Sequence, residues 1–251
     1  EGKGTTLIDD HTRDEAKAVA RVITGEGFRV SAIGSKIAKR PLSEPFHKTK
    51  EKLNRMIDIA HLLNTEFIRL FTFYPVKDKK KESQFDTVFE RLSSLAKIAE
   101  ASNKTLIMEN ERGLFGETPK ECHRIMQAVD SPRLRFVFDP ANFVQAGYPP
   151  FPEAFELLKE YTEYIHVKDA SFEDKRERPS GEGDARVLEM LKAFLNYGYK
   201  GYLSLEPHLM KFEGYGQLGY SKEIADLPSI EYRQWAVALR AFSKVLSEIS
   251  A

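Results

Sequence analysis

Six short apolar runs, separated by stretches with helical periodicity, constrain the fold of this chain more than any other feature. The runs are rich in Val, Ile, Leu and Phe at nearly consecutive positions, which is typical of strands covered on both faces of a parallel sheet. They occupy residues 29–35, 67–74, 105–111, 134–142, 164–170 and 201–208. The pattern therefore predicts repeated strand–helix units.

The stretches between the runs carry recognisable helix starts. Ser43-Glu44-Pro45 precedes one long helical pattern, and Thr118-Pro119-Lys120-Glu121 combines a capping box with proline in the first turn. We expect the first helix at 9–27 and the last at 230–249. The sequence thus alternates strand and helix from end to end.

Repeated strand–helix units form either an open doubly wound sheet or a closed barrel. No Gly-x-Gly-x-x-Gly motif follows any of the runs, so the dinucleotide-binding fingerprint is missing from the sequence. Polar residues end four consecutive runs, namely Glu109, Asp139, His166 and Glu206. A (β/α)8 TIM barrel builds its active site from such strand ends, whereas an open sheet usually uses one switch point. We therefore predict an α/β fold of the (β/α)8 TIM barrel class, forming a single domain over residues 1–251.

A closed barrel needs eight strands, and the sequence shows six runs. Residues 1–7 look like the loop that follows a strand. We therefore expect the first strand, the first helix and most of the second strand to be missing from the N-terminus of this chain, roughly forty residues at the usual unit length.

Charge and cysteine content narrow the classes of partner. The 38 basic and 38 acidic residues balance, so no net field attracts nucleic acid or an anionic membrane. No apolar run approaches the ~18 residues of a membrane span. The Lys-rich segment 77–81 is predicted to be a solvated loop. Cys122 is the only cysteine, which excludes an intrachain disulfide and predicts a reducing, cytoplasmic compartment.

The four polar residues at the strand ends have the chemistry of a metal site. Three carboxylates around one cavity repel one another unless a cation compensates them, because burying unpaired charge is costly. Three oxygen donors and one nitrogen suit Mn²⁺, Mg²⁺, Co²⁺ or Zn²⁺, and the absence of a cysteine ligand argues against a structural zinc site. We predict one divalent metal ion with Glu109, Asp139, His166 and Glu206 as ligands. The alternative is four unrelated polar residues at the starts of loops.

Five segments form an ordered set at or after the strand ends: MENERG (108–113), FDPAN (138–142), IHVKD (165–169), GEGD (181–184) and SLEPH (204–208). This set resembles the sugar phosphate isomerase/epimerase family of the xylose isomerase-like TIM barrel superfamily, over nearly the whole chain. The resemblance implies metal ligands on strands five to eight of the barrel, and these match Glu109, Asp139, His166 and Glu206. It also places the missing segment at strands one and two.

The resemblance to the ketose 3-epimerase branch implies separate roles for the ligands. Glu109 and Glu206 would bind the metal and also move a proton, one removing it from the carbon next to a carbonyl and the other returning it. The metal would stabilise the enediolate between these steps, and Asp139 and His166 would be ligands only. We predict a metal-dependent isomerase or epimerase that acts on a sugar, a sugar phosphate or a related polyol ketone.

Several positions where substrate specificity is set differ from the ketose epimerases. Asn142 stands where they have histidine, and Phe172 where they have arginine. Asn142 can still bond a substrate hydroxyl. Lys168 lies two residues after His166, on the same side of the strand. It can bind an anionic group, act as an acid, or form a structural pair with Asp169 or Glu111.

Other polar residues are weaker candidates for substrate contact. Glu111 shares the direction of Glu109 and can support the site or form a salt bridge with a basic neighbour. His208 has the same relation to Glu206 and can face substrate or lie in a loop. The amides of the glycine loop 181–183 can contact substrate or phosphate, or the loop can be a simple turn.

Three alternatives to an isomerase remain open. A dehydratase of the inosose or dehydroshikimate type uses the same scaffold, and Lys168 as an acid would favour it. AP endonucleases share the barrel but bind DNA with three zinc ions and several histidines; six histidines mostly away from the strand ends and zero net charge argue against them. A non-catalytic barrel fragment is the third. The expected partner is a small carbohydrate, and exposed sheet edges favour a homodimer or homotetramer.

Overall fold

The computed structural model describes residues 8–206, 224 and 227–250. The chain forms two compact units, one of residues 1–109, 113–116 and 124–136, the other of 110–112, 117–123 and 137–251. The larger sheet has the hydrogen-bonded order β1-β2-β3-β4-β5-β8. Strand β4 (Leu134–Phe138) begins in the first unit and ends in the second.

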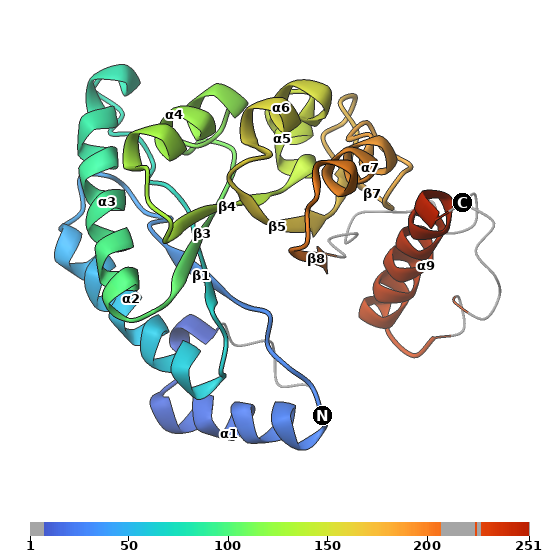
Figure 1. The fold of residues 1–251 in the computed structure, drawn as a ribbon, viewed down its shortest axis with the longest axis horizontal. Helices are drawn as coiled ribbons and strands as arrows, with labels where there is room; N and C mark the ends of the chain where they lie inside the picture. Colours follow the sequence, from blue (N-terminus) through green and yellow to red (C-terminus); the bar gives the residue numbers. More distant parts are fainter. Residues whose placement is uncertain (1–7, 207–223, 225–226, 251) are drawn as a thin grey trace. The chain divides into compact units, whose positions relative to one another are not determined.

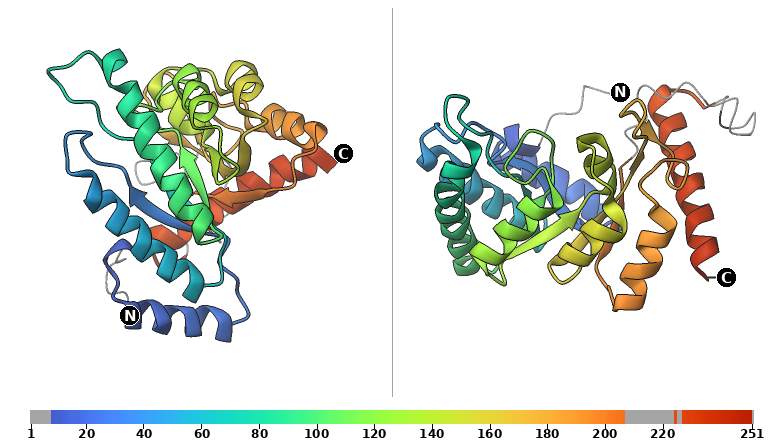
Figure 2. Two further views of the ribbon diagram at one scale, coloured as in Figure 1. Left: turned by 60° about the vertical axis from the view of Figure 1, so that its left-hand side comes forward. Right: turned by 90° about the horizontal axis from the view of Figure 1, so that it is seen from above.

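The first unit is built on parallel strands with helices packed on them (Figure 1). Ala32 is paired with Phe67, and Phe67 with Thr105, along neighbouring strands. Its elements are η1 (Ile8–Asp10), α1 (Arg13–Gly25), β1 (Ala32–Ile37), α2 (Phe46–Leu62), β2 (Phe67–Leu70), η2 (Lys81–Gln84), α3 (Phe85–Ala101) and β3 (Thr105–Glu109). Helices α2 and α3 lie side by side and pack on the strands (Figures 1 and 2).

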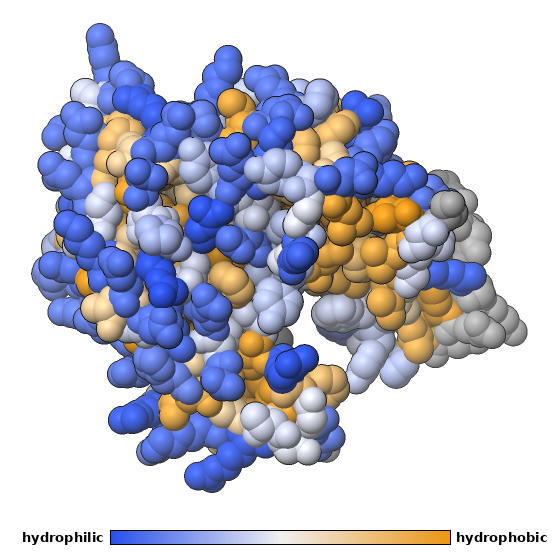
Figure 3. All heavy atoms as spheres, in the orientation of Figure 1, coloured by the Kyte–Doolittle hydropathy of each residue, from blue (hydrophilic) through white to orange (hydrophobic). Residues whose placement is uncertain are grey.

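The periodicity of α2 explains its position against the strands. Leu53, Met56, Ile57 and Ala60 are buried at i, i+3, i+4 and i+7, so one stripe of the helix faces the core. Hydrophilic side chains dominate the visible surface over α2 and α3 (Figure 3). These helices therefore form because they bury an apolar stripe, rather than through strong intrinsic propensity.

The second unit contains the end of β4 and the parallel pair β5–β8, in which His166 is paired with Ser204. Its further elements are α5 (Pro140–Ala146), η3 (Pro150–Ala154), α6 (Phe155–Leu158), β5 (Thr162–Val167), β6 (Asp169–Ala170), β7 (Glu177–Arg178), α7 (Val187–Tyr197), β8 (Tyr202–Leu205) and α9 (Ile230–Ser250). Helix α4 (Pro119–Val129) is shared by the two units. Helices α7 and α9 pack side by side (Figure 2).

A cluster of phenylalanines holds the elements of the second unit together. The ring of Phe138, at the end of β4, makes edge-to-face contacts with Phe143 of α5 and Phe194 of α7, both at 5.4 Å between centroids. Phe155 contacts Phe194 in the same way at 4.8 Å. Such pairs contribute about 0.5–1.5 kcal/mol each beyond their buried area. The cluster therefore anchors the residue that directly precedes Asp139.

The predicted elements agree with the structure in kind and differ at their boundaries. All six predicted strands are present, and the hairpin β6–β7 was not predicted. The capping box is confirmed, because Glu121 N–H donates to Thr118 Oγ1 at 3.1 Å and Thr118 N–H donates to Glu121 Oε2 at 3.3 Å. The fold is α/β and TIM-barrel-like, with six strands in the larger sheet of the described residues, rather than the eight of a closed barrel. That residues 1–251 form one domain stays a prediction.

None of the helices that the structure describes is long and apolar enough to cross a membrane.

Candidate metal site

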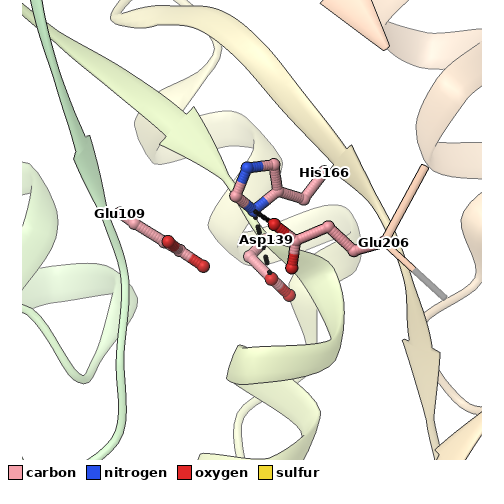
Figure 4. Close-up of side chains that lie close together, drawn as sticks. All are labelled: Glu109, Asp139, His166 and Glu206. Atoms are coloured by element: carbon pink, nitrogen blue, oxygen red, sulfur yellow. Dashed lines mark ion pairs between the residues drawn. The ribbon is translucent and has the colours of Figure 1, made fainter. Parts of the chain in front are cut away.

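Three of the four predicted metal ligands come together in the second unit (Figure 4). Asp139 directly follows β4, His166 lies near the end of β5, and Glu206 directly follows β8. Nδ1 of His166 faces both carboxylates, at 3.5 Å from Asp139 Oδ2 and 3.3 Å from Glu206 Oε1. Asp139 and His166 are buried, whereas the side chain of Glu206 is 18% exposed.

The spacing of these three ligand atoms fits a divalent cation. The atoms lie within 4.8 Å of one another. Ligands bound to a metal at 2.0–2.2 Å lie about 3 to 3.5 Å apart, which is the range of the two His166–carboxylate distances. Two carboxylate oxygens and one imidazole nitrogen are also donors that Mn²⁺, Co²⁺ and Zn²⁺ accept. The residues present therefore fit a bound metal ion.

Lys168 shares this cluster, as expected from its position two residues after His166. Its Nζ lies 3.5 Å from Asp139 Oδ2 and 3.9 Å from Glu206 Oε2. It also donates to Asn142 Oδ1 at 3.2 Å. Burial alone would raise the pKa of Asp139, but the charge of Lys168 and the contacts with His166 and the Asn142 N–H outweigh it, so this pKa is lowered. Asp139 is therefore ionised and ready to bind a cation.

A clamp around Asp139 was not predicted from the sequence. Asn110 accepts the Asp139 N–H on Oδ1 at 3.0 Å and donates from Nδ2 to the Asp139 carbonyl at 2.9 Å. The Asn142 amide donates to the Asn110 carbonyl at 2.9 Å. Asp139 also caps α5 by accepting the Asn142 N–H at 2.9 Å. These bonds fix the backbone that carries the ligand, as partners around metal ligands commonly do.

The side chain of Asn142, which was predicted to contact substrate, is bonded to other residues of the protein. Its side-chain amide is bonded at both ends within the protein, to Lys168 and to Asn110, and the residue is only 6% exposed. Its contact with substrate stays a prediction. One sequence signal could have indicated Asn110. It is a polar residue at a strand end, and because it directly follows Glu109, its side chain points to the opposite side of the strand.

Glu109 is the last residue of β3 and belongs to the first unit. It is 3% exposed, and its Oε2 forms an ion pair with Arg69 Nη1 of β2 at 2.9 Å. Arg69 was not predicted as a site residue, although it is the one charge in an otherwise apolar run. Glu111 lies beyond the end of β3 and is half-buried. His208 lies outside the described residues.

The glycine loop 181–183 binds an anion that belongs to the protein itself. Each oxygen of the buried Asp169 carboxylate accepts two backbone N–H groups, those of Ala170 and Ala185 on Oδ1 and those of Gly181 and Gly183 on Oδ2, at 2.8–3.1 Å. A Cβ at position 183 would lie 2.3 Å from Asp169 Oδ1. Glycine is therefore required there for close approach, and these amides hold the loop against the strand rather than a substrate.

Replacing Asp169 with asparagine should change how stability depends on pH. Burial raises the pKa of Asp169 to about 6, although the four N–H groups oppose this. An unfolded aspartate titrates near pH ~4, so between about pH 4 and 6 the folded chain keeps a proton that the unfolded chain releases. The Asp169 contribution to the free energy of unfolding is therefore complete below about pH 4 and falls by about 3 kcal/mol as the pH rises to about 6.

The Asp169→Asn variant lacks this titration. Urea unfolding at intervals across the window should show the wild type losing stability relative to the variant as the pH rises. A difference that is constant or grows with pH would contradict the raised pKa.

Comparison with known proteins identifies the family. Residues 4–227 match the family model described as "Xylose isomerase-like TIM barrel". The chain belongs to the xylose isomerase-like TIM barrel family. This agrees with the resemblance seen in the sequence and with the strand-end cluster. The family includes sugar isomerases, epimerases and dehydratases.

Curated relatives in this family have different reactions. The chain is 26% identical over 155 residues to an inosose dehydratase from Clostridium perfringens, covering 53% of this chain and 51% of the relative. It is 25% identical over 167 residues to fructoselysine 3-epimerase from Shigella flexneri, covering 64% and 60%. The match thus spans about half the length of these relatives, and no single reaction follows from it.

Solved structures show the shared fold. The IOLI protein with a bound zinc atom superposes with a TM-score of 0.69 at 17% identity, covering 96% of this chain and 84% of the other. A xylose isomerase-like TIM barrel protein from Mycobacterium smegmatis in complex with magnesium gives 0.68 at 17%, covering 97% and 81%. These two proteins of the same fold thus bind zinc and magnesium, respectively.

Proposed function

We propose that this protein is a divalent-metal-dependent isomerase or epimerase of a small sugar, sugar phosphate or related polyol ketone. One observation carries the proposal: Asp139, His166 and Glu206 converge at the ends of β4, β5 and β8 with ligand spacing. Active sites of TIM barrels are built at this end of the strands. A cation held by these residues would supply Lewis-acid stabilisation of the negative charge that develops on a substrate carbonyl oxygen.

Glu206 is the proposed proton-transfer residue of the second unit. Its side chain is more exposed than those of Asp139 and His166, at 18% against 0% and 6%, so it can reach a substrate as well as a metal. Its carboxylate removes or returns the proton on the carbon next to the carbonyl. Asp139 is fixed by Asn110 on its backbone and Lys168 on its side chain, and serves as a ligand only.

Glu109 is the proposed fourth ligand and the second proton-transfer residue. It directly precedes Asn110 in the chain, and the Asn110 side chain is bonded to the backbone of Asp139. The guanidinium of Arg69 lies 2.9 Å from Glu109 Oε2 and places a positive charge beside this carboxylate. A planar enediolate has two faces, and two glutamates on different strands provide a base for each. Proton removal on one face and return on the other inverts the carbon.

A dehydratase is the second candidate, and the position of Lys168 favours it. Its buried ammonium group lies 3.9 Å from Glu206 Oε2, so a general acid stands next to the proposed base. After Glu206 removes the proton, Lys168 can protonate the departing hydroxyl on the neighbouring carbon, and water is lost. The inosose dehydratase of Clostridium perfringens is among the relatives.

An exchange experiment tests both candidates at once. The chain is incubated with Mn²⁺, Mg²⁺, Co²⁺ or Zn²⁺ and a panel of ketoses, sugar phosphates and inososes in deuterated water, and followed by NMR. We expect deuterium to enter next to the carbonyl of at least one substrate, with an epimer, an isomer or an alkene as product. Absence of exchange together with absence of metal binding at millimolar concentrations would contradict the proposal.

A further inference from the structure

A cavity of about 610 Å³ lies within the first unit. It is lined by three loop segments, each of which follows the carboxyl end of a strand, namely β1, β2 and β3. The lining residues are Pro41, Ser43, Tyr74, Pro75, Val76, Lys77, Lys79 and Gly113. A volume of this size is ordinary for a small-molecule site.

Hydrogen bonds between the loops shape the cavity in advance. Tyr74 N–H donates to the Arg40 carbonyl at 3.0 Å, and Leu42 N–H donates to the Tyr74 carbonyl at 2.9 Å. Phe115 N–H donates to the Phe73 carbonyl at 3.1 Å. The three segments are therefore tied to one another just outside the sheet, and the walls do not depend on a ligand.

The lysine segment is an exposed loop at residues 77–80, as predicted, and its backbone is also braced. The buried Gln84 accepts the Val76 N–H at 2.9 Å and donates from Nε2 to the carbonyls of Val76, Lys79 and Lys80 at 3.2–3.3 Å. Gln84 thus holds the backbone of the loop while the Lys77 and Lys79 side chains stay exposed at the cavity. Lys81 is turned elsewhere, over the Phe115 ring at 5.8 Å.

The chemistry of the lining selects a class of ligand. Tyr74, Pro41, Pro75 and Val76 provide an apolar wall, which suits a flat apolar face of a ligand. Lys77 and Lys79 bring two positive charges to the same cavity, whereas the exposed Asp78 between them in the chain is not among the residues that line it. A neutral ligand would make no charge interaction with these two lysines, and a cationic ligand would be repelled by them.

We propose that this cavity binds a small organic anion, a phosphate or carboxylate carried on a body with a flat apolar face. The body packs on Tyr74 and the prolines, and the anionic group lies between Lys77 and Lys79. The site belongs to the first unit alone and does not rest on the proposed reaction, so it holds whether the metal cluster serves an isomerase, a dehydratase or neither.

NMR titration of the whole chain tests this site with four probes: phenyl phosphate, benzoate, phenol and inorganic phosphate. We expect phenyl phosphate or benzoate to shift the amide signals of Tyr74, Val76 and Gly113. Affinity for phenol and for inorganic phosphate should be roughly tenfold weaker, because each lacks one of the two recognised groups. The comparison of phenyl phosphate with benzoate distinguishes the two sources of negative charge.

Two variants separate charge from packing. The double variant Lys77→Ala/Lys79→Ala should weaken binding of the anionic probe roughly tenfold, because two surface charge contacts together contribute about that much. It should also remove the salt dependence of binding. Tyr74→Ala should weaken both phenol and phenyl phosphate. The matched control is Lys48→Ala/Lys80→Ala, which removes the same charge from exposed lysines that do not line the cavity.

The results that overturn the proposal are specific. Equal affinity in the Lys77/Lys79 variant and the Lys48/Lys80 control would show that only net charge attracts the probe. Shifts that map away from Tyr74, Val76 and Gly113, or no binding by either aromatic anion at about 10 mM, would also overturn it. None of these outcomes depends on enzyme activity. The proposed binding site can therefore be refuted while the proposed function stands, and the proposed function can be refuted while the binding site stands.

Discussion

The Glu206→Gln variant should exchange the substrate proton about a thousandfold more slowly than the wild type, because positioned acid–base groups contribute roughly 10²–10⁴ in rate. The substitution keeps the size of the side chain and removes its basicity. It leaves Asp139 and His166 in place, so metal binding should weaken but persist. The measurement is deuterium incorporation into the substrate that the exchange screen identifies, at saturating metal.

Glu173→Gln is the matched control, since Glu173 is an exposed glutamate of the same unit that takes no part in the cluster. It should exchange at the wild-type rate. Full exchange by the Glu206→Gln variant would refute a glutamate base at this position. Loss of exchange at a metal concentration that saturates the wild type, restored at a higher concentration, would assign Glu206 to metal binding alone.

The Asp139→Ala variant should lose about 4 kcal/mol of stability and its metal affinity together. The side chain is fully buried, caps α5 through the Asn142 N–H, and lies 3.5 Å from the Lys168 ammonium. Removing one partner of a buried ion pair costs about 3–5 kcal/mol, and the low end applies here because Glu206 Oε2 still lies 3.9 Å from Lys168 Nζ. Loss of the helix cap adds about 1 kcal/mol. Urea unfolding and metal titration measure the two effects.

Two further variants resolve the causes of that loss. Asp139→Asn keeps an oxygen for the Asn142 N–H and should therefore be less destabilised than Asp139→Ala. Adding Lys168→Met to Asp139→Ala removes the buried ammonium that has lost its nearer carboxylate and should recover part of the stability. If the double variant is no more stable than Asp139→Ala, the buried charge of Lys168 is not what Asp139 compensates.

The strands were predictable because a strand buried on both faces must be apolar, and the six runs carry that signal locally. Their ends were less predictable. The run at 67–74 stays apolar past the end of β2 at Leu70, since Phe71 and Phe73 are buried in the core without belonging to the strand. Burial and strand pairing coincide only in part, so an apolar run overestimates a strand.

The strand predicted at 134–142 extends past the end of β4 at Phe138, and the sequence itself contained the reason for the earlier end. Asp139-Pro140 is a cap followed by proline at the first helical position, and α5 starts there. The same aspartate thus ends a strand, caps a helix and joins the cluster. Its role as a candidate ligand and its role as a cap arise from one position at a strand end.

The sequence by itself determined the strand–helix order and the positions of Glu109, Asp139, His166 and Glu206 at strand ends, because these depend on local periodicity and on the two-residue repeat of a strand. Only the tertiary structure decided what surrounds them. Asn110 is hydrogen-bonded to Asp139, 29 residues further along the chain, and Lys168 to Asn142, 26 residues before it. The Asp169 carboxylate accepts amides of a loop up to 16 residues away. Such bonds depend on which groups packing leaves buried and in need of a partner, and no local pattern records that.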